Sequence, residues 1–79
     1  MRYSLTIYYR SDEQVIFDLP LSFRFIGQGL NLETRERDWQ IEGASIGEAV
    51  RFVVSMCNRL VSRGVINVDY RVEINPILN

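Results

Sequence analysis

The sequence predicts an α+β domain in which one amphipathic helix packs on one face of a mostly antiparallel sheet of four or five strands. Three observations lead to this fold class. Residues 45–64 carry a helical period of apolar residues, other segments alternate apolar and polar residues, and glycine, proline or charged clusters separate them. The predicted order is strand, strand, a further short strand, strand, strand, helix and strand, and a helix on one sheet face is its simplest packing.

Length and composition predict a single domain over residues 1–79. The hydrophobic fraction of 47% and the charged fraction of 24% are typical of a folded globular chain. Area scaling predicts that folding lowers the accessible surface from roughly 13,000 to about 5,000 Å². That burial is enough for a marginally stable monomer, which oligomerisation would stabilise further.

The helix is predicted over about 46–63 because both of its ends carry termination signals. Ser45 and Glu48 have the spacing of a capping box, in which the carboxylate reaches back to the Ser45 amide. Arg63 suits the negative end of the helix dipole, and Gly64 suits the left-handed residue that follows many helices. The predicted buried stripe consists of Ile46, Ala49, Val50, Val53, Cys57, Leu60 and Val61.

The strands before the helix follow from alternation and turn signals. Residues 2–10 alternate and predict a strand with one buried face, and the polar turn 11–14 leads to a returning strand at 15–19. Pro20 ends that strand or marks a break at a sheet edge, and a further short strand is predicted at 21–25.

The middle of the chain predicts a second hairpin. Gly27-Gln28-Gly29 indicates a turn or bulge rather than a phosphate-binding loop, because no helix start follows it. A strand at 30–34 runs into the charged cluster 33–38, which we interpret as a solvated turn, and a short strand at 39–42 completes the hairpin.

After the helix, the last strand is predicted from five apolar residues at a period of two. We expect Pro76 to end this strand and residues 77–78 to form an apolar tail against the core. The apolar residues are Ile66, Val68, Tyr70, Val72 and Ile74.

The absence of histidine and lysine excludes several classes of catalytic site. All nine basic residues are arginine, the chain has no histidine and no lysine, and Cys57 is its one cysteine. Nucleophile–histidine pairs, lysine Schiff bases, P-loops and internal disulfides are therefore excluded within one chain. Cys57 is interpreted as a small buried hydrophobe. The all-arginine set is either a compositional bias or a preference for planar donors that bind carboxylates and phosphates.

The carboxylates do not predict a metal site. Asp12 with Glu13, or Glu36 with Asp38, could hold a hard cation, but no spacing matches a calcium loop. A domain with one helix also offers little concavity for a hydrolase with paired carboxylates. We therefore expect no catalytic residues, no metal, no cofactor and no enzyme activity.

One candidate partner-binding surface lies on the helix. Arg51, Arg59 and Arg63 share about one third of the helix circumference, which forms a positive patch in a chain of net charge −1. Phe52 and Met56 flank the buried stripe, so they are either a wide edge of the core or an exposed apolar edge that contacts a partner or a second copy. The patch is either a solvated face or a grip on an acidic partner surface.

A second candidate surface is the exposed face of the sheet. Tyr8, Arg2, Arg10 and Arg71 are placed there by alternation, and arginines with aromatics are how several small modules hold single-stranded nucleic acid. The net charge of −1 and the sequence pI of about 5.3 argue against this ligand.

The sequence therefore favours a small non-catalytic protein-binding module, which suits an inhibitor encoded by a phage or mobile element that acts by occupying a partner's surface. A single-stranded nucleic-acid-binding module and a subunit of a small homo-oligomer, including a homodimer, remain as alternatives. No segment resembles a signal peptide or a membrane span, so a cytoplasmic location is expected, in the cell of origin or in a host.

Overall fold

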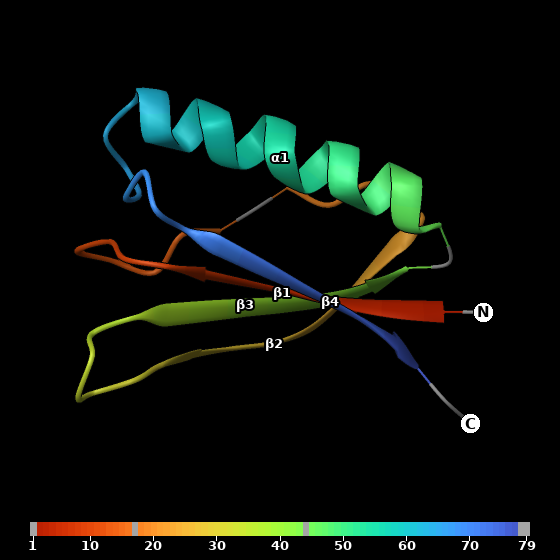
Figure 1. The fold of residues 1–79 in the computed structure, drawn as a ribbon, viewed down its shortest axis with the longest axis horizontal. Helices are drawn as coiled ribbons and strands as arrows, with labels where there is room; N and C mark the ends of the chain where they lie inside the picture. Colours follow the sequence, from red (N-terminus) through yellow and green to blue (C-terminus); the bar gives the residue numbers. More distant parts are fainter. Residues whose placement is uncertain (1, 17, 44, 78–79) are drawn as a thin grey trace.

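The computed structural model describes residues 2–16, 18–43 and 45–77, and its elements are four strands and one helix. The strands form one antiparallel sheet in the order β2-β3-β1-β4, and the helix lies across one face of it (Figure 1). This confirms the α+β class, with four strands in the part of the chain that is described. The elements are β1 (Arg2–Tyr9), β2 (Phe23–Leu30), β3 (Arg37–Gly43), α1 (Ile46–Ser62) and β4 (Arg71–Ile77).

Two connections cross the sheet on the same side. β3 and β4 are both antiparallel to β1 and therefore parallel to each other, so α1 joins them as a split β-α-β unit. β1 and β2 are both antiparallel to β3, and the segment that joins them contains no helix within its described residues 10–16 and 18–22. Val15 belongs to the core and Leu19 packs against it, which places this irregular segment beside α1 (Figure 1).

The core lies between α1, residues 10–22 and one face of the sheet. The alternation predicted for β1 is confirmed, because Leu5, Ile7 and Tyr9 are fully buried. Cys57 is also buried, as expected, and burial raises the pKa of its thiol to about 11. The core residues are Leu5, Ile7, Tyr9, Val15, Phe23, Trp39, Ile41, Ala49, Val53, Cys57 and Ile66.

The helix begins and ends at the predicted residues, but the Glu48 carboxylate bonds Ser22 and not, as expected, the Ser45 amide. The Ser45 hydroxyl oxygen accepts a hydrogen bond from the Glu48 backbone N–H at 3.3 Å, Arg63 is the C-cap, and Gly64 has φ of 72°. The Glu48 carboxylate accepts a hydrogen bond from the Ser22 hydroxyl at 2.9 Å, which ties the start of the helix to the segment before β2.

The buried face of α1 is rotated from the predicted stripe. Ile46 and Val50, which we predicted to be buried, are 42% and 37% exposed. Phe52 and Met56 instead pack against the core, because residues 10–22 extend the apolar surface under that side of the helix. Both residues therefore form a wide edge of the core and remain only partly buried, which leaves their predicted contact with a partner untested.

The predicted returning strand at 15–19 is wrong, since both neighbours of β1 are other strands, β3 and β4. The buried Tyr9 hydroxyl is the hydrogen-bond acceptor for this segment instead of a neighbouring strand. It accepts hydrogen bonds from the Val15 backbone N–H at 3.1 Å and from Gln14 Nε2 at 2.7 Å. A side chain thus satisfies a donor that a strand ladder would otherwise satisfy.

Of the turn or bulge expected at residues 27–29, the turn is ruled out because both glycines lie inside β2. The register shifts between Phe25 and Gly27, so the bulge that we considered there is confirmed. The hairpin turn instead follows Leu30, the last residue of β2. Of the strand predicted at 30–34, only Leu30 therefore lies in a strand.

The last strand starts later than predicted. Val68 is 79% exposed and precedes β4, which begins at Arg71 and includes Pro76. Pro76 does not end the strand, because β4 is an edge strand whose outer side needs no ladder donor. The proposed apolar tail falls partly on Leu78, which lies outside the described residues.

Candidate functional site

A groove runs between α1 and the irregular segment before β2, and we call it the α1 groove. It encloses about 310 Å³. A neighbouring cavity of about 270 Å³ shares Ile16 with it and is lined by Ile16, Leu19, Phe25, Gln28 and Trp39. These hollows exist because an extended segment is thinner than a helix, whose diameter is about 10 Å. The α1 groove is lined by Ile16, Asp18, Phe52, Ser55, Met56, Arg59, Leu60 and Arg63.

The apolar side of the α1 groove is fixed by the core. The rings of Phe52 and Phe23 stack with centroids 5.5 Å apart, and Met56 and Leu60 pack against the buried cluster. On the other side, Ile16 is 89% exposed although it is a large apolar residue. The groove therefore combines a fixed, partly buried apolar surface with one exposed apolar side chain.

The charged side of the α1 groove carries Arg59 and Arg63. In residues 2–16, 18–43 and 45–77, neither guanidinium group takes part in an ion pair or a side-chain hydrogen bond. Asp18 lines the same groove and supplies one negative charge. The groove therefore presents donors that the fold leaves unused.

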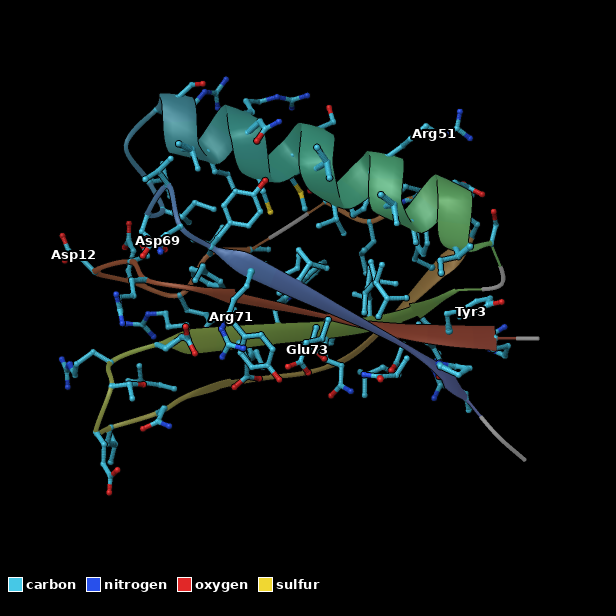
Figure 2. The ribbon with its side chains drawn as sticks, in the orientation of Figure 1. Tyr3, Asp12, Arg51, Asp69, Arg71 and Glu73 are labelled. Carbon is cyan, nitrogen blue, oxygen red and sulfur yellow. The ribbon has the colours of Figure 1, made fainter. Side chains whose placement is uncertain are left out.

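Four of the five residues predicted from the helix meet in this groove, namely Phe52, Met56, Arg59 and Arg63. Arg51 does not line it and lies on the side of α1 that faces away from the sheet (Figure 2). Sequence reasoning missed Ile16 and Asp18, because residues 15–19 were assigned to a strand. One sequence signal could have found Ile16. It directly follows Val15, and if Val15 is buried, alternation leaves Ile16 exposed.

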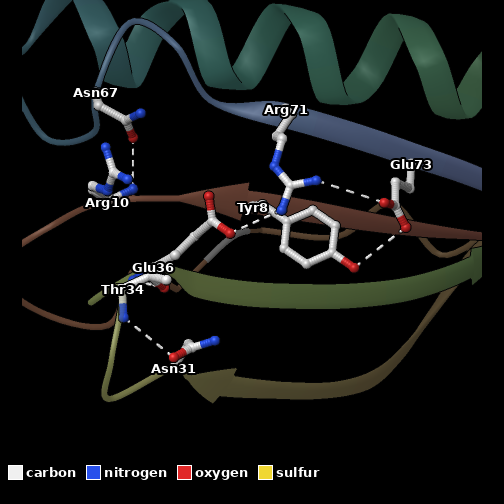
Figure 3. Close-up of polar contacts among 8 residues, drawn as sticks. All are labelled: Tyr8, Arg10, Asn31, Thr34, Glu36, Asn67, Arg71 and Glu73. Atoms are coloured by element: carbon white, nitrogen blue, oxygen red, sulfur yellow. Dashed lines mark hydrogen bonds and ion pairs between the residues drawn. The ribbon is translucent and has the colours of Figure 1, made fainter.

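On the opposite face of the sheet, Tyr8 and Arg71 are brought together as predicted, but by contacts that occupy both of them. The guanidinium carbon of Arg71 lies 4.2 Å from the Tyr8 ring centroid. Arg71 also bonds Glu36 at 2.9 Å and lies 3.6 Å from Glu73, and the Tyr8 hydroxyl donates to Glu73 at 3.3 Å (Figure 3). The Glu36 hydrogen bond raises the pKa of Arg71.

The other two arginines predicted for the sheet face lie apart from this cluster. Arg2 is at the far end of β1, where it and Arg24 each bind Glu42 at 3.1 Å. Arg10 follows the last residue of β1, and its backbone N–H donates to Asn67 Oδ1 at 2.6 Å (Figure 3). The four residues therefore do not form one continuous nucleic-acid surface.

Comparison with known proteins does not identify a family. No protein-family model, curated protein or solved structure matches the chain. Among the described residues, no group of three or more histidine, cysteine, aspartate or glutamate side chains could hold a metal ion. No helix in the same residues is long and apolar enough to cross a membrane. The fold and the α1 groove define a small α+β domain with a half-apolar, half-cationic groove.

Proposed function

We propose that this protein is a non-catalytic protein-binding module whose α1 groove receives a segment of a partner protein. One observation carries the proposal: an apolar surface fixed by the core converges in one groove, beside the exposed Ile16, with two guanidinium groups that have no ion-pair partner among the described residues. Apolar anchors combined with arginine are the usual sources of affinity at protein interfaces.

The chemistry of the groove defines the partner segment. An apolar side chain would contact Phe52 and Met56, and carboxylates beside it would bind Arg59 and Arg63 through bidentate hydrogen bonds. Asp18 is the one acidic residue of the lining, so it would repel an acidic segment bound in the reverse direction. The favoured partner is an acidic, amphipathic segment with a single orientation.

Such a module acts by occupying its partner's surface, and the small size of this chain suits an inhibitor, including one encoded by a phage or mobile element. A second copy of the chain is an alternative occupant of the groove. Its binding would be visible as a doubled solution mass in light scattering.

The sheet face gives weaker support to a nucleic-acid-binding function. The Tyr8 ring is already covered by Arg71, so a base would have to displace that guanidinium group before stacking. Phosphates would also meet carboxylates on this face. The acidic residues there are Glu36, Asp38, Glu42 and Glu73, against Arg2, Arg24 and Arg71.

The proposal is tested by capturing partners from a lysate with and without nuclease and measuring the affinity of the purified partner for two matched variants. Arg59→Gln with Arg63→Gln should weaken binding by about 2 kcal/mol or more and leave the Tm unchanged. Arg2→Gln with Arg24→Gln removes the same charge from the sheet face and should leave the affinity unchanged.

Equal affinities for wild type and the Arg59/Arg63 variant would contradict the proposal. Capture that disappears after nuclease treatment would instead favour the nucleic-acid alternative. In that case affinity should fall steeply with salt, and each lost phosphate contact should reduce the slope by about one unit.

A further inference from the structure

A separate cavity lies at the end of the sheet away from both termini, and we call it the arginine pocket. It encloses about 460 Å³, more than either cavity beside Ile16. Three connections form it: residues 10–12 after β1, the hairpin between β2 and β3, and residues 64–67 after α1 (Figure 1). These connections lie far apart in the sequence and meet only because the sheet order brings the strand ends together.

The lining of the arginine pocket is strongly cationic. Arg10, Arg35 and Arg37 line it, and Asp12 is the one acidic residue of the lining. The Asp69 carboxylate interacts electrostatically with Arg10 from beside the pocket, so the lining keeps a positive excess in a chain whose net charge is −1. A positive excess within one cavity favours an anionic ligand.

One of the three arginines is held in place by the fold. Arg37 Nε donates to the Ser11 carbonyl at 3.2 Å, and Arg37 Nη2 donates to the Asp12 carbonyl at 3.3 Å. The guanidinium group is therefore oriented by neutral acceptors and keeps its full charge. Within the described residues, the side chains of Arg10 and Arg35 form no ion pair or hydrogen bond.

The backbone of Arg35 is a second, independent indication. Its φ is 64°, and no other non-glycine residue in the described ranges has a positive φ. The hairpin fixes this conformation, because the Arg35 N–H donates to the Asn31 carbonyl at 2.7 Å and the Asn31 N–H donates to the Glu36 carbonyl at 2.8 Å. Glycine would adopt this conformation without strain. An arginine in this conformation carries backbone strain and places its guanidinium group at the pocket.

From these observations we infer that the arginine pocket binds the phosphate group of a small anionic ligand. The planar guanidinium groups of Arg10 and Arg35 offer paired N–H donors to phosphate oxygens, and Arg37 adds the N–H groups that its bonds to the two carbonyls leave free. A positive lining of this kind favours a phosphate group, which carries roughly −1.5 to −2 at neutral pH. This ligand site is distinct from the α1 groove, with which it shares no lining residue.

The test is an NMR titration of the full chain with inorganic phosphate at constant ionic strength, with acetate as the competing anion. Saturable shifts at residues 10–12, 35–37 and 64–67 are expected with phosphate. Because the chain has no histidine, the pH dependence should follow the ligand's own second ionisation near pH 6. Binding should therefore be tighter at pH 8 than at pH 5.5. Acetate that binds as tightly as phosphate would overturn the assignment.

The decisive variant is Arg35→Gly, which removes both the guanidinium group and the backbone strain. It should raise the Tm and weaken phosphate binding roughly tenfold or more. Arg51→Gln removes the same charge from the far side of α1 and should leave binding unchanged. Phosphate affinity retained in Arg35→Gly, or lost equally in Arg51→Gln, would refute the site. Arg10→Gln provides a second loss-of-binding variant that does not alter the hairpin.

Discussion

The two sides of this molecule use the same residue type in opposite ways. On the open sheet face, Arg2, Arg24 and Arg71 all form ion pairs with glutamates. On α1, Arg59 and Arg63 have no such partner among the residues that the structure describes. The sheet arginines are used within the fold, whereas the helix arginines remain available to another molecule.

The geometry of strands and helices explains the difference. Antiparallel pairing sets Arg24 directly opposite Glu42, which places the two side chains on the same face. On α1, the neighbours of Arg59 three and four residues away are Ser55, Met56, Ser62 and Arg63, and none of them is acidic. Two like charges four residues apart destabilise a helix by roughly 0.2–0.5 kcal/mol. The negative end of the helix dipole favours these cations by a similar amount, so the fold tolerates both arginines without an acidic partner on α1.

The largest effect is expected from Val53→Asp, because Val53 is 1% exposed at the centre of the buried face of α1. An unpaired charge there should prevent folding and abolish the groove and the sheet face together. Val54→Asp is the matched control, since Val54 is 42% exposed and should tolerate the charge. Circular dichroism distinguishes the two variants. A folded Val53→Asp protein would show that the helix packs through another face.

The next prediction compares the stability cost of removing the hydroxyl from two adjacent tyrosines on opposite sides of the sheet. Tyr9→Phe should cost about 1–3 kcal/mol, because it leaves the buried Val15 N–H without its acceptor. It should also loosen the groove wall at Ile16. Tyr8→Phe removes only an exposed hydrogen bond to Glu73 and should change the free energy of unfolding by less than about 1 kcal/mol. Urea denaturation measures both values, and similar costs would contradict the assigned roles.

Alkaline pH should lower the free energy of unfolding through Cys57 in the core, and not through either set of arginines. The pKa of Cys57 is raised from 9.0 to about 11 by burial, so the thiol stays neutral in the folded chain while the unfolded chain ionises. Its contribution is fully present below about pH 9 and is lost as the pH rises toward 11. The loss at pH 10 is on the order of 1 kcal/mol. Cys57→Ala should show a shallower decline of unfolding free energy between pH 8 and 10, and an identical slope would contradict this cause.

The smallest effect concerns the ion pairs of the sheet. Glu42→Gln frees both Arg2 and Arg24, yet exposed pairs contribute only about 0–1 kcal/mol each. Stability should fall by about 1 kcal/mol at low salt and by less at high salt, as thermal denaturation at two ionic strengths would show. A loss that does not depend on salt would mean that Glu42 contributes by packing.

Local sequence signals made the helix predictable. The segments that were predicted wrongly depend on contacts between residues that are not neighbours in the sequence. Ser45 and Gly64 mark the helix ends in the sequence itself. The conformation of the segment after β1 depends instead on a hydrogen bond from the Val15 N–H to the Tyr9 hydroxyl. The apolar periodicity of the sequence does not reveal this bond. Alternation had therefore indicated a strand where the structure has an irregular crossing segment.

The candidate site divides in the same way. Helical spacing grouped Phe52, Met56, Arg59 and Arg63, which the structure brings to one groove. Its opposite wall comes from the misassigned segment and could not be anticipated. On the sheet face, the partner of Arg71 is Glu36, which lies 35 residues away in the sequence, so its pairing depends on the strand order.

The contrast between paired and unpaired arginines can be measured directly from the NMR relaxation and solvent exchange of each arginine Nε–H in the free protein. Arg24 Nε lies 3.1 Å from Glu42, and Arg37 Nε donates to the Ser11 carbonyl at 3.2 Å. These two groups should be ordered and slow to exchange. Arg59 and Arg63 should exchange rapidly, with order parameters below about 0.6. Arg59 and Arg63 groups as ordered as that of Arg37 would contradict the claim that the fold leaves them free for a partner.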